Sequence, residues 1–155
     1  MSIQEELLLS AVWESSADAM RISDSRGIVL NVNESYCKLT GFKKKEIIGK
    51  PFSFVYDKNE QQELQNKYFD FLSSNRETER SDKKVTFSNG EIRNIEASYS
   101  RIEILEEKYV LAIIRDITDF MNALAGQKES EEKFRTVADY TYEWEYWISP
   151  EGEII

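Results

Sequence analysis

GIVLNVNESYCKLTGFKKKEIIGKP, residues 27–51, is the stretch of sequence that decides the fold. It opens with β-branched and apolar residues, which favour a strand over Ile28–Val32. Asn33 follows as a predicted helix N-cap, because its side chain can accept a hydrogen bond from a free backbone N–H of the first turn. Gly41 is predicted to end that helix with a left-handed backbone, and a second short helix is expected over 43–48. The stretch therefore predicts a strand followed by two short helices.

Upstream of this stretch, the sequence predicts a helix and a further strand. Residues 1–18 contain no Gly or Pro, and apolar residues recur there at spacings of three and four, so we expect an amphipathic helix. Ala19–Ile22 is predicted to be a strand that pairs with Ile28–Val32 across the turn-forming residues 24–27.

Downstream, Asp57 and Glu60 match a variant of the capping box and predict the start of a long helix. Pro51 is suited to the first turn of a short helix just before it. The long helix is expected to turn one apolar face towards the rest of the domain, with the residues Leu64, Tyr68, Phe71 and Leu72.

The next part of the chain predicts antiparallel strands. Asn89-Gly90 lies between two alternating runs, and we expect both residues at the centre of a tight hairpin turn because both tolerate positive φ. The apolar run from Tyr109 to Ile114 predicts a central strand buried on both faces. From Thr118 onward the pattern predicts a helix again.

Composition excludes several classes of function. The 155 residues include 20 Lys and Arg against 29 Asp and Glu, which gives a net charge of −9, with no histidine and one cysteine. The acidic balance argues against nucleic-acid binding. The missing histidine argues against His-dependent catalysis and His-ligated haem or zinc, and a single cysteine allows no intramolecular disulfide or Cys-only metal site. These missing catalytic groups also lead us to expect that the chain is not an enzyme. Since no membrane-spanning run or signal peptide is apparent, we expect a cytoplasmic protein without a membrane partner.

The end of the chain repeats its beginning. After a shift of 125 residues, Leu9 falls on Phe134 and Gly27 falls on Gly152. A helix followed by a strand–turn–strand pattern thus occurs twice. We therefore expect a flanking helix (1–18), a main domain (19–118), a linker helix (119–133) and the truncated start of a second copy of the domain (134–155).

Several short motifs, taken in their order along the chain, resemble those of the PAS domain family of sensory modules. They are Gly27-x-Val29-x-x-x-Asn33, the helix from Asn33 to Gly41-Phe42, Glu46-Ile-Ile-Gly49-Lys-Pro51, the Asn89-Gly90 turn, Arg115-Asp116-Ile117-Thr118, and Glu129-Ser-Glu-Glu-Lys-Phe134-Arg. The resemblance implies an α+β fold, in which a five-stranded antiparallel sheet carries short helices on one face. An N-terminal amphipathic helix and a C-terminal exit helix would flank it.

The resemblance also implies a function. We expect a cytoplasmic sensory and dimerisation module of a multidomain signalling protein, with a sensor histidine kinase as host and neighbouring PAS and output domains in the same chain. The alternative is a ligand-free structural or interaction module in a cyclase or a transcriptional regulator. Fold alone does not decide between them.

Two cofactor classes of the family do not fit this sequence, so no cofactor is predicted. The region 51–56, where flavin-binding relatives carry a reactive cysteine, has none, and haem-binding relatives use a histidine that this chain lacks. A pocket for a small apolar molecule or metabolite remains, although the same aromatic residues could simply fill the core, which is the reading favoured by the dense packing of protein interiors. The candidate lining residues are Phe52, Phe54, Tyr56, Leu64, Tyr68, Phe71, Phe87, Ile95, Ala97, Ile102 and Ile113.

Two further groups of residues are candidates for function. Asp116 and Thr118 lie at the junction of the last strand and the exit helix, where they could cap the helix and relay a signal. On the N-terminal helix, one apolar stripe is expected to remain uncovered and to form a homodimer. Its residues are Leu7, Leu8, Ala11 and Val12.

Overall fold

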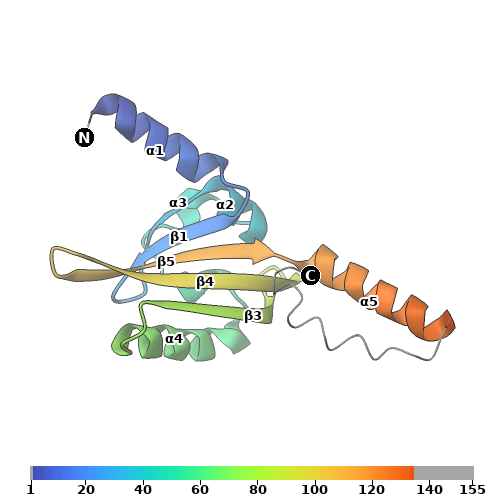
Figure 1. The fold of residues 1–155 in the computed structure, drawn as a ribbon. Helices are drawn as coiled ribbons and strands as arrows, with labels where there is room; N and C mark the ends of the chain where they lie inside the picture. The colour runs from blue at the N-terminus through green and yellow to red at the C-terminus, as the bar shows by residue number, and fades with distance from the viewer. Residues whose placement is uncertain (1, 135–155) are drawn as a thin grey trace. The chain divides into compact units, whose positions relative to one another are not determined.

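The computed structural model describes residues 2–134, in two units that divide after Ile117. Within residues 2–117, five strands form one antiparallel sheet in the order β2-β1-β5-β4-β3 (Figure 1). The strands are β1 (Ala19–Asp24), β2 (Val29–Val32), β3 (Thr78–Thr86), β4 (Ile92–Ile104) and β5 (Glu107–Asp116). The predicted PAS-like α+β fold is confirmed, with β5 at the centre of the sheet.

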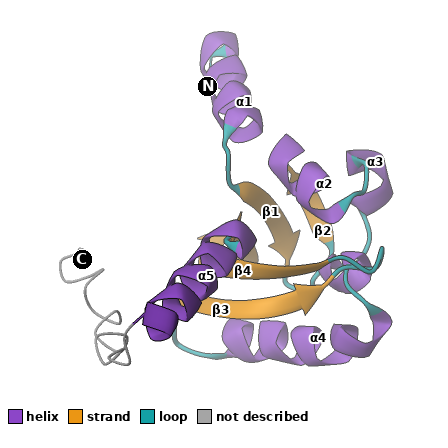
Figure 2. Cartoon of the chain, turned by 90° about the vertical axis from the view of Figure 1, so that its right-hand side faces the viewer, coloured by secondary structure: helices purple, strands orange, loops and turns teal. Residues whose placement is uncertain are grey.

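The helices of the first unit are α1 (Ile3–Ser15), α2 (Glu34–Thr40), α3 (Lys44–Ile47), the 3₁₀ helix η1 (Phe52–Val55) and α4 (Lys58–Ser73). Figure 2 shows α4 running alongside β3, at the edge of the sheet. The second unit contains α5 (Thr118–Phe134). No helix of the described chain is long and apolar enough to cross a membrane. The predicted start of a second domain lies outside the described residues.

Asn33 joins three elements of the fold. Its Oδ1 accepts hydrogen bonds from the backbone N–H of Tyr36, at 3.0 Å, and of Met20, at 2.9 Å. Its Nδ2 donates to the carbonyl oxygens of Trp13 and Asp18. The predicted N-cap is therefore confirmed, and the same buried amide fixes α2 against β1 and the end of α1. Gly41 ends α2 with φ at +84°, as the sequence predicts.

The sheet buries one face under the helices. In β1 the buried residues are Ala19, Arg21 and Ser23, whereas Met20 and Ile22 are half-buried on the outer face. Aromatic and branched side chains complete the core, among them Tyr36, Phe52, Val55, Tyr56, Tyr68, Phe71, Phe87, Ile95, Val110 and Ile114.

The hairpin between β3 and β4 differs from the prediction. Only Gly90 has a positive φ, at +92°, and the N–H of Phe87 donates to the carbonyl of Glu91. The loop therefore has three residues, and Asn89 keeps a negative φ while its side chain accepts a hydrogen bond from the N–H of Glu91. A two-residue turn with positive φ at both positions occurs instead at Leu105-Glu106, between β4 and β5.

The predicted capping box at the start of α4 is also wrong. Asp57 does cap the helix, by accepting from the N–H of Asn59 at 3.1 Å. The carboxylate of Glu60, however, accepts from the N–H of Thr86 at 3.2 Å, so it holds the end of β3 instead of its own helix start. The consequence is a fixed contact between the N-terminus of α4 and the edge strand.

Helix α1 is present as predicted, but it is not amphipathic with respect to its own domain, because none of its residues is buried. Only its C-terminal end contacts the domain, through Asn33 and through an ion pair between Glu14 and Lys44 at 3.0 Å. Leu7, Leu8 and Leu9 are consecutive and point in three directions, so no single stripe collects the apolar side chains. The exposed large side chains are Ile3, Leu7, Leu8, Leu9 and Val12.

Candidate ligand pocket

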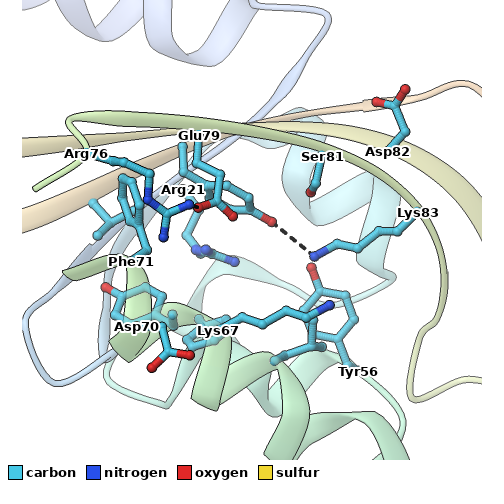
Figure 3. Close-up of a pocket in the computed structure, with 15 residues that line it drawn as sticks. Arg21, Tyr56, Lys67, Asp70, Phe71, Arg76, Glu79, Ser81, Asp82 and Lys83 are labelled. Atoms are coloured by element: carbon cyan, nitrogen blue, oxygen red, sulfur yellow. Dashed lines mark hydrogen bonds and ion pairs between the residues drawn. The ribbon is translucent and has the colours of Figure 1, made fainter. Parts of the chain in front are cut away.

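A cavity of about 330 Å³ lies between α4 and the inner face of the sheet (Figure 3). Every strand except β2 contributes to its walls, together with η1, α4 and the segment between α4 and β3. Its lining residues are Arg21, Phe52, Tyr56, Leu64, Lys67, Tyr68, Asp70, Phe71, Arg76, Glu79, Ser81, Asp82, Lys83, Tyr99 and Val110.

Arg21 is the most unusual of these residues, because it is a charged side chain with only 1% of its surface exposed. The alternation of β1 turns it inward. Its Nη1 donates to the hydroxyl of Tyr36 at 3.5 Å, and its Cζ lies 4.8 Å from the ring centre of Phe52. Its Nε–H has no hydrogen-bond partner. Among the side chains that the structure describes, no carboxylate lies within ion-pair distance of this guanidinium.

Arg21 stays charged despite its burial, because the pKa of a guanidinium lies far above neutral pH. Burial by itself lowers the pKa of the guanidinium, but the neighbouring phenol groups of Tyr36, Tyr56 and Tyr99 outweigh this effect and raise it above its ordinary value. Burial likewise raises the pKa of Tyr56, and the proximity of Arg21 offsets only part of that shift. At neutral pH the pocket thus contains a buried cation surrounded by neutral hydroxyl groups.

Tyr68 fastens the helical wall of the pocket to the sheet. Its hydroxyl lies 2.8 Å from Oγ of Ser23 and donates to the carbonyl of Asp24 at 2.6 Å. Its ring stacks on Phe52, with 4.6 Å between the ring centres. The guanidinium of Arg21 lies over the same Phe52 ring. Burial raises the pKa of Tyr68, since its partners only partly offset the loss of solvent.

The outer part of the pocket is polar and carries both signs of charge. The inward-facing positions of β3 before Val85 are Glu79, Ser81 and Lys83. Lys83 Nζ donates to the hydroxyl of Tyr99 at 3.3 Å, and Glu79 pairs with Arg76. The wall formed by β3 is therefore hydrophilic, whereas Phe52, Leu64, Phe71 and Val110 make other parts of the lining apolar.

Figure 3 shows the guanidinium of Arg21 between two groups of charged side chains, with Arg76 and Glu79 on one side and Lys67 and Asp70 on the other. Four basic and three acidic side chains line the pocket in all. The local balance is thus positive by one charge, in a chain whose net charge is −9.

The structure brings together five of the eleven residues predicted to line a pocket. Phe52, Tyr56, Leu64, Tyr68 and Phe71 line the cavity. Three others are buried in the core away from it, namely Phe87, Ile95 and Ala97. Phe54 is half-buried and packs on Phe42, with 5.1 Å between the ring centres.

Ile113 and Ile102 were expected at the pocket, and this expectation is wrong. Val110, Ala112 and Ile114 are the buried positions of β5, so Ile113 points to the opposite face of the sheet. Ile102 pairs with Tyr109, which is also an outward position. Because side chains alternate along a strand, a run that is apolar throughout does not reveal which half faces the helices.

Sequence reasoning missed the charged half of the site. Arg21 lies between Met20 and Ile22, and that pattern favours placing the two apolar residues inside and the arginine outside. The residues of β3 from Thr78 to Lys84 are mostly charged, so no apolar alternation marks this part of the strand in the sequence. The one available signal was the short period-2 pattern of Ala19, Arg21 and Ser23, which places small or polar residues on one face.

The two predicted relay residues lie where β5 ends and α5 begins. Asp116 is the last residue of β5, and its Oδ2 lies 3.8 Å from Nε of Arg93. Next to it, the N–H of Ile117 donates to the carbonyl of Asn94 at 2.8 Å. Thr118 is the first residue of α5. A role of Asp116 or Thr118 in relaying a signal stays a prediction.

No metal centre is apparent in the described part of the chain, where no group of three or more Cys, Asp or Glu side chains could hold an ion. Cys37 is a free, half-buried thiol on α2, and burial raises its pKa, which disfavours the reactive thiolate.

Comparison with known proteins agrees with this fold. The family model described as PAS fold matches residues 7–117. No curated protein matches the chain. A PAS domain of an HTR-like protein from Haloarcula marismortui has a similar structure, with a TM-score of 0.61 and 22% identity over 74% of this chain and 93% of that one.

Two other solved structures are similar. One is a domain of a sensory box sensor histidine kinase/response regulator from Geobacter sulfurreducens, with a TM-score of 0.58 and 20% identity over 72% of this chain and 94% of that one. The other is the PAS domain of a LuxR-family transcriptional regulator from Burkholderia thailandensis in complex with ethanol, with a TM-score of 0.56 and 11% identity over 76% and 98%.

Proposed function

This chain belongs to the PAS family of sensory signalling modules, and from that premise we propose that its cavity is the ligand-sensing site of a cytoplasmic signal-transduction protein. One observation carries the proposal, namely a cavity of about 330 Å³ that contains a buried cation without an acidic partner. Protein interiors normally pack without large voids and pair their buried charges. Departures from both rules at one place are typical of functional sites.

The floor of the pocket supplies a route for the signal. Arg21 pairs with Ala112 of β5, and Val110 of the same strand lines the cavity. β5 continues along the chain through Asp116 into Thr118 and α5. A ligand that shifts Arg21 would thereby act on the strand that leads into the exit helix.

The host that we propose is a sensor histidine kinase, with neighbouring PAS and output domains in the same chain. A similar structure from such a kinase supports this choice, and the regulator from Burkholderia thailandensis supports a transcriptional regulator as the alternative. The bound ethanol of that regulator is also consistent with a PAS pocket that accepts a small molecule.

Self-association through α1 is the second part of the proposal. Leu7, Leu8, Ala11 and Val12 are all exposed, and the domain leaves most of the helix uncovered. Exposed apolar surfaces of this kind are typical of partner interfaces. We expect light scattering to report a dimer for the whole chain and a monomer for a chain that starts at Ala17. Monomers in both cases at high micromolar concentration would rule this part out.

Native mass spectrometry of gently purified protein tests the sensing site. We expect a bound small molecule in the parent, and none in Ser81→Trp, which fills the cavity from β3. Ser98→Trp is the matched control, because Ser98 pairs with the outward-facing Ile113 and does not line the pocket. A parent without a bound mass that also binds no small molecule in solution would contradict a sensing role.

Hydrogen exchange tests the relay. Filling the pocket with Ser81→Trp should change the exchange rates of residues 118–134, whereas Ser98→Trp should leave them as in the parent. Equal rates in the parent and both variants would mean that the pocket does not act on α5.

A further inference from the structure

We propose that the pocket binds a small organic monoanion, whose carboxylate pairs with the guanidinium of Arg21 and whose apolar body contacts Phe52, Leu64 and Phe71. This inference rests on the proposed sensing function and adds the chemical class of the ligand. Nothing in the comparisons assigns such a site.

Arg21 has no counter-charge among the described side chains. Removing a cation from water costs several kcal/mol unless an opposite charge and hydrogen bonds replace the lost hydration. Arg21 is 1% exposed, and its guanidinium donates to the hydroxyl of Tyr36 and lies over the ring of Phe52. Both are neutral groups. A bound anion would supply the counter-charge that the described side chains do not.

The geometry around Arg21 leaves one of its donors without a partner in the part of the chain that the structure describes. The Cζ of Arg21 lies 4.8 Å from the ring centre of Phe52, so the ring occupies one side of the guanidinium. The Nε–H lies on an edge of the guanidinium and has no hydrogen-bond partner within the described residues. A carboxylate that accepts from Nε and from one Nη forms the two parallel hydrogen bonds that arginine favours. The Nε–H is therefore one of the two donors needed for this bidentate contact, and no group of residues 2–134 uses it.

The charge of the side chains that line the pocket favours a ligand with a single negative charge. Four basic and three acidic side chains line the pocket, so one negative charge balances it. Arg76 already pairs with Glu79, and the other charged groups besides Arg21 lie at the exposed or half-buried wall. Since only one cation is buried, the site suits a monoanion better than inorganic phosphate.

The volume of the cavity and the polarity of its walls limit the size and type of the ligand. At about 30 Å³ for each water molecule in the liquid, the cavity corresponds to roughly eleven waters. Beside Arg21 the apolar residues that line it are Phe52, Leu64, Phe71 and Val110. Such walls favour an aromatic or aliphatic body over a second charged group. A compound of the size of benzoate or hexanoate matches these limits.

Calorimetry with paired probes tests the inference. Sodium benzoate and hexanoate are compared with benzamide and hexanamide, which keep the shape and lose the charge. We expect the parent to bind at least one carboxylate about ten- to a hundredfold more tightly than its amide, because hydrogen bonds to charged groups contribute that much. The side-chain Nε–H signal of Arg21 in an NMR spectrum should shift when the carboxylate binds.

Arg21→Met is the decisive variant, since it removes the charge and keeps an unbranched side chain. Because it leaves no acidic partner unpaired, we expect it to melt at the same temperature as the parent or higher, and to lose carboxylate binding. Arg80→Met is the matched control on the outward face of β3, where Arg80 pairs with Glu96, and it should bind as the parent does. If Arg21→Met does not fold, Arg21→Lys keeps the charge without the fork and should bind at least about tenfold more weakly.

The outcomes separate this inference from the sensing function. Equal binding of carboxylate and amide, or undiminished binding in Arg21→Met, would overturn the inference. If a neutral molecule were bound in the parent and lost in Ser81→Trp, the sensing function would stand and the inference would fail. Binding of inorganic phosphate in preference to both carboxylates would overturn the assignment of a carboxylate. Absence of any bound mass and of any probe binding would contradict both proposals.

Discussion

Tyr68→Phe tests the contact that closes the pocket, between α4 and β1. The substitution removes only the hydroxyl that lies 2.8 Å from Oγ of Ser23 and donates to the carbonyl of Asp24. That carbonyl keeps a second partner, because the N–H of Gly27 also donates to it at 2.9 Å. Ser23, which is fully buried, loses its partner altogether. The loss of stability therefore comes mainly from the buried Ser23 hydroxyl, which is left without a hydrogen-bond partner.

An unsatisfied buried hydroxyl costs about 1–3 kcal/mol, so Tyr68→Phe should lower the free energy of unfolding by that amount. Ser23→Ala should cost less, about 1 kcal/mol, because the Tyr68 hydroxyl still donates to Asp24. In the double variant no hydroxyl is orphaned. It should therefore be more stable than Tyr68→Phe alone, which is a strong departure from additivity.

Urea unfolding followed by circular dichroism measures the four free energies of this cycle. Tyr109→Phe is the matched control, because Tyr109 is half-buried on the outer face of β5 and its hydroxyl makes no hydrogen bond within the described residues. It should change stability by no more than about 0.5 kcal/mol. A Tyr68→Phe variant as stable as the parent, or a double variant whose loss equals the sum of the two single losses, would refute the reasoning.

Three further predictions concern the core, a turn and a carboxylate. Phe71→Ala should cost about 3–5 kcal/mol in urea unfolding, because the ring is only 4% exposed. Gly90→Val should cost about 1 kcal/mol or more in a thermal melt, from its φ of +92° alone, since nothing lies within 4 Å of an added Cβ. For Asp24, burial raises the pKa, but hydrogen bonds from the N–H groups of Ile28 and Arg26 and the Arg26 guanidinium hold it below 3.8. Its stabilising contribution is therefore present above about pH 4 and lost as the pH falls further, so the stability difference between the parent and Asp24→Asn should shrink below about pH 4.

The fold could be predicted from short-range signals that do not depend on the rest of the chain. Asn33 and Gly41 begin and end α2 through local hydrogen bonding and local backbone conformation, and both predictions were correct. Two related predictions failed, and a distant partner explains the first of them. Glu60 binds the backbone of β3 instead of completing its own cap, and Asn89 lies in a three-residue loop.

The aromatic half of the pocket could be predicted, whereas its charged half could not. Tyr68 and Phe71 recur at helical spacing, so their common face was visible in the sequence. The face of a strand depends on register, and register is set by neighbouring strands. Arg21 therefore reads as an outward residue until β1 is paired with β5, where Arg21 lies opposite Ala112, an inward position.

The apolar residues on the outer face of the sheet explain why the sequence pattern places Arg21 on the wrong face of β1. Met20 and Ile22 face outward, and they pair with Ile113 and Leu111 of β5. These four side chains are half-buried, so the central strands carry apolar residues on both faces. A pattern rule that assigns the apolar face to the core then has no basis for choosing a side. An outer face of this kind also offers a surface for the exposed apolar residues of α1 from a second copy, which agrees with the proposed self-association. Met20→Glu should then weaken the dimer as much as removal of α1 does, whereas a dimer that tolerates Met20→Glu would place the partner surface of α1 elsewhere.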